Sequence, residues 1–133
     1  MTKMQMTRRS FAIGLAGVPL LASPLFLNRA SAHHGWTWAE EEKFELSGTI
    51  QEIFIGNPHA VLSVEAEDGL WTVELAPPSR TRAAGFDENA AKIGDQVTAI
   101  GNRSRDHAEK RMKAVRLIVN GKTYDVYPDR VQS

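Results

Sequence analysis

Histidines are the residues of this chain best suited to bind a metal ion, and there are four of them. The chain has no cysteine, which excludes thiolate ligands and cysteine nucleophiles. His33 and His34 are adjacent and directly follow the segment Ala30-Ser31-Ala32, His59 ends the run Asn57-Pro58-His59, and His107 lies in a charged stretch. Neutral imidazole is the commonest metal ligand in proteins, so these positions define the candidate site.

Cleavage between Ala32 and His33 would make His33 the N-terminal residue. A terminal histidine offers its α-amine and its imidazole together, and the amine titrates near pH 8, so a metal can displace its proton near neutrality. A second imidazole completes a three-nitrogen set, which favours Cu(II). We therefore expect a copper ion bound by His33 and His59, with His34 as a further ligand or a neighbouring hydrogen-bond donor. His107 is the least suited, and Met112 is expected in the core.

The competing interpretation of the same residues needs no metal. His59 would then hydrogen-bond backbone groups of its own turn, and the two adjacent histidines would only form a polar start. The chain would be a structural or interaction module that docks on an envelope protein. We expect no enzyme, because no serine has a nucleophile-elbow context and no glycine-rich phosphate loop is present. A copper oxygenase would need an open coordination position and a substrate surface, and the sequence indicates neither.

The first 32 residues have the pattern of an export signal. The pair Arg8-Arg9 precedes an apolar stretch over residues 11–27, which two glycines and two prolines interrupt. Such a stretch is typical of a signal peptide and poor as a stable membrane span. We expect a twin-arginine signal peptide over residues 1–32, cleaved after Ala32, and a mature protein in the periplasm or outside the cell.

Charge is distributed unevenly along the chain, although 16 basic and 16 acidic side chains balance overall. The first 32 residues contain four of the basic residues and no acid, so the rest holds 12 basic and 16 acidic side chains, a net charge of −4. Nucleic-acid phosphates bind basic surfaces. The charge of the mature part therefore argues against a nucleic-acid partner.

Residues 33–133 are expected to form one all-β domain. Turn signals at Glu67-Asp68-Gly69 and Asn120-Gly121 predict hairpins. Gly48 permits close approach of a second strand, and a change of buried face after Glu52 predicts a bulge. The expected strands cover residues 44–55, 60–66, 70–75, 96–102, 112–119 and 122–127, and a short helix capped by Ser79 covers residues 80–84. This order favours a small OB-like antiparallel barrel of five or six strands, with a β-sandwich as the alternative.

Seven short motifs of the mature part occur together in one known family. They are Ala32-His33-His34, Leu46-Ser47-Gly48-Thr49-Ile50, Asn57-Pro58-His59, Gly69-Leu70-Trp71-Thr72-Val73-Glu74, the stretch from Pro77 to Phe86, Ile93-Gly94-Asp95-Gln96-Val97-Thr98 and Ile100-Gly101. On these motifs the chain resembles the small exported bacterial proteins of domain-of-unknown-function family 6152. It departs from them at Gly35-Trp36, Phe86 and Asp106-His107. The resemblance implies an exported β domain and supplies no activity.

Overall fold

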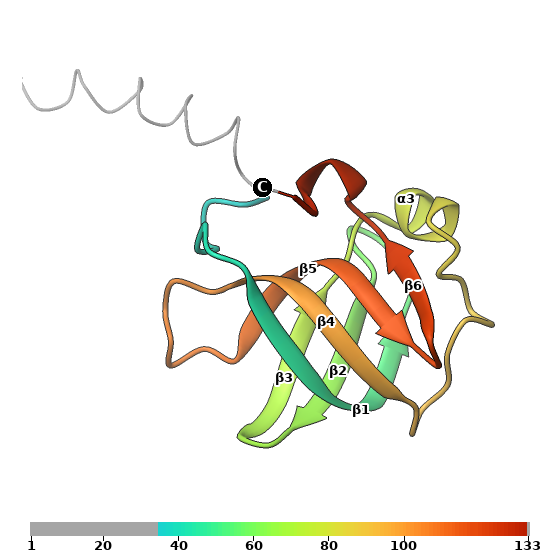
Figure 1. The fold of residues 1–133 in the computed structure, drawn as a ribbon, viewed down its shortest axis with the longest axis horizontal. Coiled ribbons are helices and arrows are strands. Elements are labelled where there is room, and N and C mark those ends of the chain that lie inside the picture. Colours follow the sequence, from blue (N-terminus) through green and yellow to red (C-terminus); the bar gives the residue numbers. More distant parts are fainter. Residues whose placement is uncertain (1–34, 133) are drawn as a thin grey trace, which may run out of the picture. The chain divides into compact units, whose positions relative to one another are not determined.

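The computed structural model describes residues 35–132. The chain divides into two compact units, Met1–Thr37 and Trp38–Ser133. Residues 35–37 of the first unit lie in a turn, and the second unit is the β domain of Figure 1. The predicted signal peptide, with Arg8 and Arg9 and the cleavage position after Ala32, lies outside the described residues.

The first half of the domain is a three-stranded meander made of β1 (Phe44–Phe54), β2 (Val61–Ala66) and β3 (Gly69–Glu74). The predicted bulge is present, because the register of β1 against β2 shifts between Ile50 and Glu52. A β-carbon on Gly48 would lie 2.8 Å from a methyl carbon of Val64 and closer still to the Glu65 carbonyl oxygen. Only glycine therefore lets β2 cross β1 at this point, which bends the long first strand into a barrel wall.

A short helix, α3 (Pro78–Ala83), connects the meander to the rest of the domain. Ser79 does not cap it, contrary to our expectation: the N-cap is Pro77, without a side-chain cap, and Ser79 lies inside the first turn. Pro78 starts the helix because its fixed φ suits the first helical position. Phe86 is buried after the helix, and its ring meets that of Tyr124 edge-on, with the centroids 5.2 Å apart.

The second half consists of β4 (Gln96–Arg103), β5 (Arg111–Val119), β6 (Lys122–Asp125) and the 3-10 turn η1 (Pro128–Arg130). The sheet order is β3-β2-β1-β4-β5-β6, and a further pairing of β3 with β5 closes the barrel. Asn120 and Gly121 both have positive φ, as a two-residue hairpin requires. The closing pair is parallel, with Val73 opposite Met112. This corrects the expectation of a wholly antiparallel barrel: two strands far apart in the chain close the sheet, without a hairpin between them.

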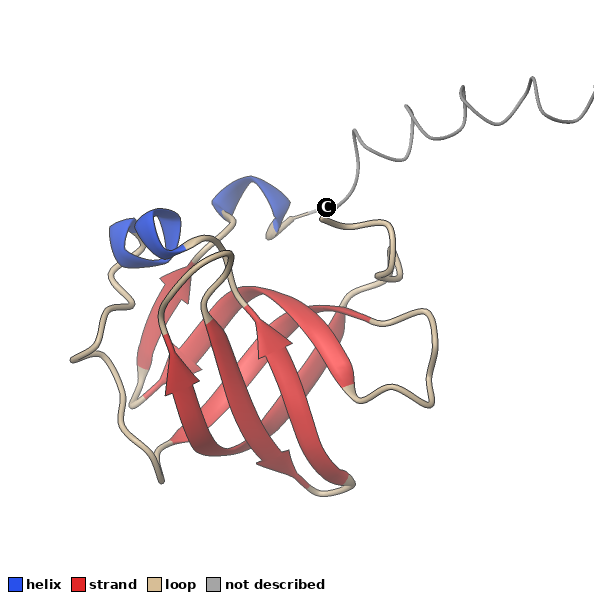
Figure 2. Ribbon diagram, turned by 180° about the vertical axis from the view of Figure 1, so that it is seen from behind, coloured by secondary structure: helices blue, strands red, loops and turns tan. Residues whose placement is uncertain are grey.

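The domain is an all-β barrel of the OB type (Figures 1 and 2). Both helical segments lie toward the same end of the barrel in Figure 2. Side chains fill the barrel, because the inward residues of all six strands are almost completely buried. They include Leu46, Ile50, Leu62, Val64, Trp71, Val73, Val97, Ala99, Met112, Leu117, Val119 and Tyr124. Any ligand of this domain must therefore bind at its surface. Across residues 35–132, no helix is long and apolar enough to cross a membrane.

Candidate functional site

His59 lies at the end of the β1–β2 loop, half-buried, directly after the cis peptide between Asn57 and Pro58. The next residue, Ala60, is completely buried. Its N–H donates to the Ala76 carbonyl at 3.0 Å, and its carbonyl accepts from the N–H of Leu75 at 2.8 Å. This double hydrogen bond fixes the backbone beside His59 to the chain that follows β3. A ligand held by such a backbone keeps its geometry, as metal sites require.

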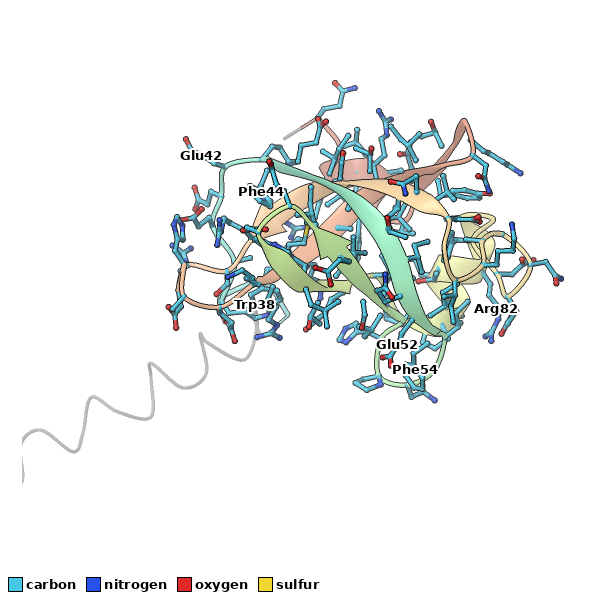
Figure 3. The ribbon with its side chains drawn as sticks, turned by 90° about the horizontal axis from the view of Figure 1, so that it is seen from below. Trp38, Glu42, Phe44, Glu52, Phe54 and Arg82 are labelled. Carbon is cyan, nitrogen blue, oxygen red and sulfur yellow. The ribbon has the colours of Figure 1, made fainter. Side chains whose placement is uncertain are left out.

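The same loop carries an exposed aromatic side chain. Phe54 ends β1 and is 54% exposed. A β-carbon at Gly56 would lie 2.5 Å from the tip of the Phe54 ring, so the ring lies directly on the Gly56 backbone. Figure 3 shows Phe54 and Glu52 projecting at this part of the molecule. The neighbourhood of His59 in the sequence therefore combines one imidazole with an apolar, partly exposed surface.

Trp38, at the start of the β domain, is attached to the barrel wall by Arg111. The Arg111 guanidinium carbon lies 3.7 Å from the centroid of the Trp38 ring. Its Nε and Nη2 donate to Glu74 Oε2 at 3.0 and 2.6 Å. Glu74 is the register partner of Val61, which lies two residues after His59. The chain thus enters the domain beside the β2–β3 pair that begins at the His59 loop.

His107 lies on the exposed β4–β5 loop and already has a carboxylate partner. Its Nε2 lies 2.7 Å from Glu40 Oε2. Met112 is completely buried in the core, as predicted, and cannot serve as a ligand at the surface. Within residues 35–132, no three side chains of His, Asp or Glu are grouped so that they could hold a metal ion. His33 and His34 lie outside the described residues, so of the three predicted ligands the structure describes only His59.

A layered aromatic and cationic cluster near the β4–β5 loop was not predicted. The rings of Phe44 and Trp71 stack with centroids 5.2 Å apart. The Arg103 guanidinium carbon lies 5.0 Å from the first centroid and 4.9 Å from the second. Its Nη2 donates to the His107 carbonyl at 3.4 Å, whereas its Nε is buried without a partner. These residues are far apart in the chain, so no local sequence signal marks the cluster.

Lys113 is the second feature that was not predicted, because its amine is buried in the folded domain. It lies on β5 opposite Glu74 and is 1% exposed. Burial lowers the pKa of Lys113, while the Glu74 carboxylate raises it and Arg111 lowers it further. Tyr127, whose ring centroid lies 5.9 Å from the Lys113 ammonium nitrogen, has its pKa raised mainly by burial. The two groups cover the outer side of the barrel where β3 and β5 join.

Solved structures with a similar fold are remote in sequence. A ZRD-deleted mutant of TiaS in complex with agmatine is 14% identical over 64% of this chain and 26% of its own, with a TM-score of 0.48. The Stn1-Ten1 complex of S. pombe is 15% identical over 68% of this chain and 63% of that one, with a TM-score of 0.48. The mitochondrial single-stranded DNA-binding protein Rim1 of S. cerevisiae is 13% identical over 59% and 94%, with a TM-score of 0.45.

The chain spans about a quarter of the length of the TiaS chain that it matches. No curated protein sequence matches it. A family model does match, over residues 24–113, and this range includes β1 to β4, the His59 loop and both predicted N-terminal histidines. The chain belongs to the family of unknown function DUF6152.

Proposed function

We propose that this chain is an exported, non-enzymatic binding module that holds one copper ion at its mature N-terminus. The α-amine and imidazole of His33 supply two nitrogen ligands, and the imidazole of His59 supplies the third. His34 lies beside them as a further ligand or a hydrogen-bond donor to the site. The twin arginines Arg8-Arg9 direct export, and cleavage after Ala32 creates the α-amine.

One observation carries this proposal: His59 is a half-exposed imidazole on a backbone that the folded barrel holds in place. Ala60 fixes the backbone beside His59 through two hydrogen bonds. Arg111 ties Trp38 to Glu74, whose strand pairs with the strand that follows His59. Four residues lie between His33 and Trp38, and an extended chain over these five steps reaches about 17 Å. The proposal requires this length of chain to bring His33 to His59.

The donor set supports copper over other divalent ions. Amine and imidazole nitrogens suit the tetragonal preference of Cu(II), which also heads the affinity series for divalent ions of the first transition row. The chain has no cysteine to add the thiolates that structural zinc sites often use. Ligand nitrogens must lose their protons before they bind, so copper affinity rises with pH through the titration range of the α-amine.

A metal-free interaction module remains the second candidate, and the surface of the barrel favours it. Phe54, Leu70 and Ile93 are 54%, 55% and 64% exposed, which gives the domain apolar contact points outside a filled core. Single-stranded DNA, which Rim1 binds according to its name, is a poor partner for this chain. Glu45, Glu52 and Glu65 lie exposed on β1 and β2, and carboxylates repel phosphates.

The test is native mass spectrometry and copper titration of protein purified from cells that export the full chain. Mass spectrometry reports the N-terminal residue and any bound metal together. We expect one tightly bound copper ion, and at least about tenfold weaker binding for His59→Ala and for a protein with one additional alanine before His33. His107→Ala is the matched control and should bind copper as the wild type does, because the imidazole of His107 is already paired with the Glu40 carboxylate.

Tight copper binding that survives both changes contradicts the proposed site. If the protein binds no copper and copper does not raise its unfolding temperature, the proposed site is also contradicted. That result favours the interaction module. The second readout is decisive because a ligand that binds only the native state must stabilise that state.

A further inference from the structure

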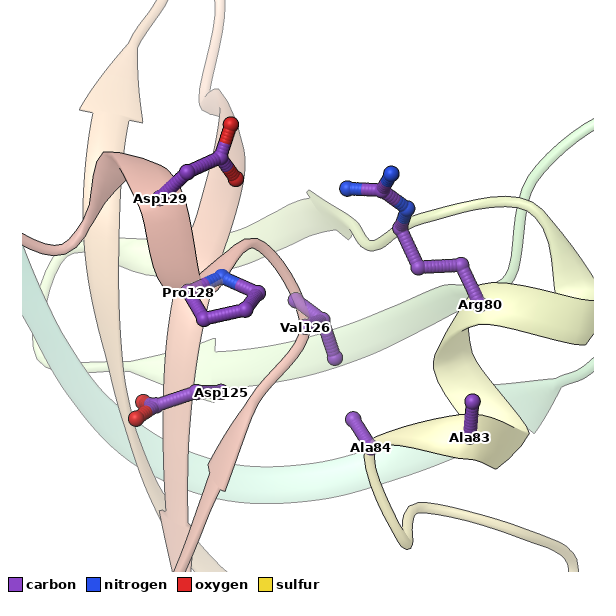
Figure 4. Close-up of a pocket in the computed structure, with 7 residues that line it drawn as sticks. All are labelled: Arg80, Ala83, Ala84, Asp125, Val126, Pro128 and Asp129. Atoms are coloured by element: carbon purple, nitrogen blue, oxygen red, sulfur yellow. The ribbon is translucent and has the colours of Figure 1, made fainter.

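A small surface pocket separates α3 from the chain that follows β6 (Figure 4). Its volume is about 320 Å³, near the lower limit of sites that bind small molecules. The lining residues are Arg80, Ala83, Ala84, Asp125, Val126, Pro128 and Asp129. The pocket lies entirely within the β domain and contains no histidine, so it is separate from the copper site proposed above.

The pocket combines an apolar lining with two charged groups. Ala83, Ala84, Val126 and Pro128 provide the apolar surface. In Figure 4 the guanidinium of Arg80 extends over the pocket from α3, and the carboxylate of Asp129 projects from the other wall. The remaining charged residue, Asp125, is already neutralised, because Arg116 Nε donates to it at 2.6 Å and Nη2 at 3.1 Å.

Arg80 is oriented by an aromatic ring and has no anionic partner among residues 35–132. Its guanidinium carbon lies 5.2 Å from the centroid of the Tyr127 ring, and it forms no ion pair within the described part of the chain. Arg82, two residues later on the same helix, is bound to Glu88 at 2.6 Å. A guanidinium stacked on a ring keeps its in-plane N–H donors available for a carboxylate. Arg80 can therefore bind an anion, whereas Arg82 is already paired with Glu88.

Asp129 provides the opposite charge across the pocket. It lies in the first turn of η1 and is exposed. Among the residues that the structure describes, no lysine, arginine or histidine forms an ion pair with it. One unpaired cation and one unpaired carboxylate thus face a shared apolar surface. The ligand that complements this arrangement carries a carboxylate, an ammonium group and a small apolar body.

We propose that this pocket binds a free α-amino acid with an apolar side chain. The ligand carboxylate accepts hydrogen bonds from the Arg80 guanidinium, a pairing that is stronger than one between neutral groups. The ligand ammonium group donates to Asp129, and its side chain packs on Ala84, Val126 and Pro128. A phosphate or another simple anion would leave Asp129 unpaired and the apolar surface uncovered, so charge complementarity favours the zwitterion.

Calorimetric and NMR titrations of the metal-free protein, purified from cells expressing the full chain, test this proposal with L-leucine as the probe. We expect saturable binding at millimolar leucine, with amide shifts confined to α3 and the segment after β6. Arg80→Gln and Asp129→Asn should each weaken binding about tenfold. Arg82→Gln is the matched control and should leave binding unchanged, because it removes an arginine of the same helix that Glu88 already neutralises.

Two ligand analogues and one further variant show which groups of the ligand and which pocket surface contribute to binding. Leucinamide lacks the carboxylate and N-acetylleucine lacks the ammonium group, so both should bind about tenfold more weakly than leucine. Ala83 is exposed on α3, so Ala83→Leu should fill the pocket and abolish binding while the unfolding temperature stays the same. Absence of saturable leucine binding overturns the proposal. N-acetylleucine bound as tightly as leucine also overturns it, since the ligand would then be a peptide C-terminus.

Discussion

Gly101 is the position where one added methyl group tests the closure of the barrel most directly. It lies on β4 between two other strands, opposite Phe44 of β1 and Ala114 of β5. A β-carbon there would lie 2.7 Å from the Ala114 α-carbon and closer still to the Lys113 carbonyl oxygen. Both atoms belong to the backbone of β5, so no side-chain rotation relieves the contact. Gly101→Ala must push β4 and β5 apart.

The size of the effect follows from these contacts. Carbon atoms pack at about 3.5–4.0 Å, so the two strands must separate by about 1 Å beside Gly101. Hydrogen bonds of ordinary length then exceed about 3.5 Å, and two lost ladder bonds cost about 1 kcal/mol each. Overpacking adds about 1–3 kcal/mol. We expect Gly101→Ala to lower the free energy of unfolding by about 3 kcal/mol or more, a large part of the 5–15 kcal/mol typical of such domains.

Urea unfolding measures this free energy, and the denaturant slope shows whether the transition stays two-state. Gly94→Ala is the control, because Gly94 has a positive φ of 98° and no atom within 4 Å of an added β-carbon. Backbone strain alone should then cost about 1 kcal/mol. A loss below about 1 kcal/mol for Gly101→Ala, with an unchanged slope, would show that β4 and β5 are not packed as the structure has them.

Two further predictions concern charged pairs on the barrel wall. Arg111→Lys should lower the free energy of unfolding by about 1–2 kcal/mol and shift tryptophan emission to the red. The reason is that an ammonium cannot both stack on Trp38 and donate two N–H groups to Glu74. Unchanged unfolding and emission would contradict this prediction. Hydrogen bonds from Arg116 lower the pKa of Asp125, so this pair stabilises the fold above the ordinary carboxyl range and is lost as the pH falls through the lowered pKa. Asp125→Asn should therefore flatten the acid side of the stability curve between pH 6 and pH 2, and an equally steep curve in the variant would refute the coupling.

Local sequence signals predicted most of the barrel correctly. Alternating apolar residues located all six strands, usually within one or two residues of the observed bounds, because one face of each strand packs into the core. The shift of face after Glu52 predicted the bulge in β1, and Gly48 predicted the close crossing. Asn120-Gly121 predicted the last hairpin. Each of these signals acts between neighbours in the chain, which is why a single sequence reveals it.

The features that the sequence did not reveal depend on contacts between distant segments. No local signal predicted how Lys113 is buried, because the chain after β6 folds back over β5. The N–H groups of Val126 and Tyr127 donate to the Val115 carbonyl, which places the Tyr127 ring 5.9 Å from the Lys113 ammonium nitrogen. The parallel pairing of β3 with β5 is equally non-local. Strand alternation reports which face is buried against the core and not what covers the other face.

The candidate site also has one feature that the sequence predicted and one that it did not. The pattern Asn57-Pro58-His59 predicted a histidine in a tight turn; the structure places His59 at the end of a loop that bends at Asn57 and Pro58, and buried Ala60 fixes the backbone beside it. The attachment of Trp38 to Arg111 could not be predicted, because stacking of a guanidinium on a ring 73 positions away leaves no periodic signal. Yet this attachment limits how far the residues before Trp38 can reach.

The copper proposal depends on export as well as on the geometry of His59. The hydrogen bonds of Ala60 hold the backbone beside His59 within the barrel itself. In the proposed processing, the α-amine of His33 forms only when the bond to Ala32 is cleaved; before that, the same nitrogen is an amide, a much weaker ligand than an amine. The uncleaved chain would therefore lack the chelating pair of amine and imidazole, which the proposal places at the mature terminus. Copper affinity should consequently differ between the uncleaved and the cleaved protein even though their barrels are the same, and an equal affinity would assign the copper to imidazoles alone.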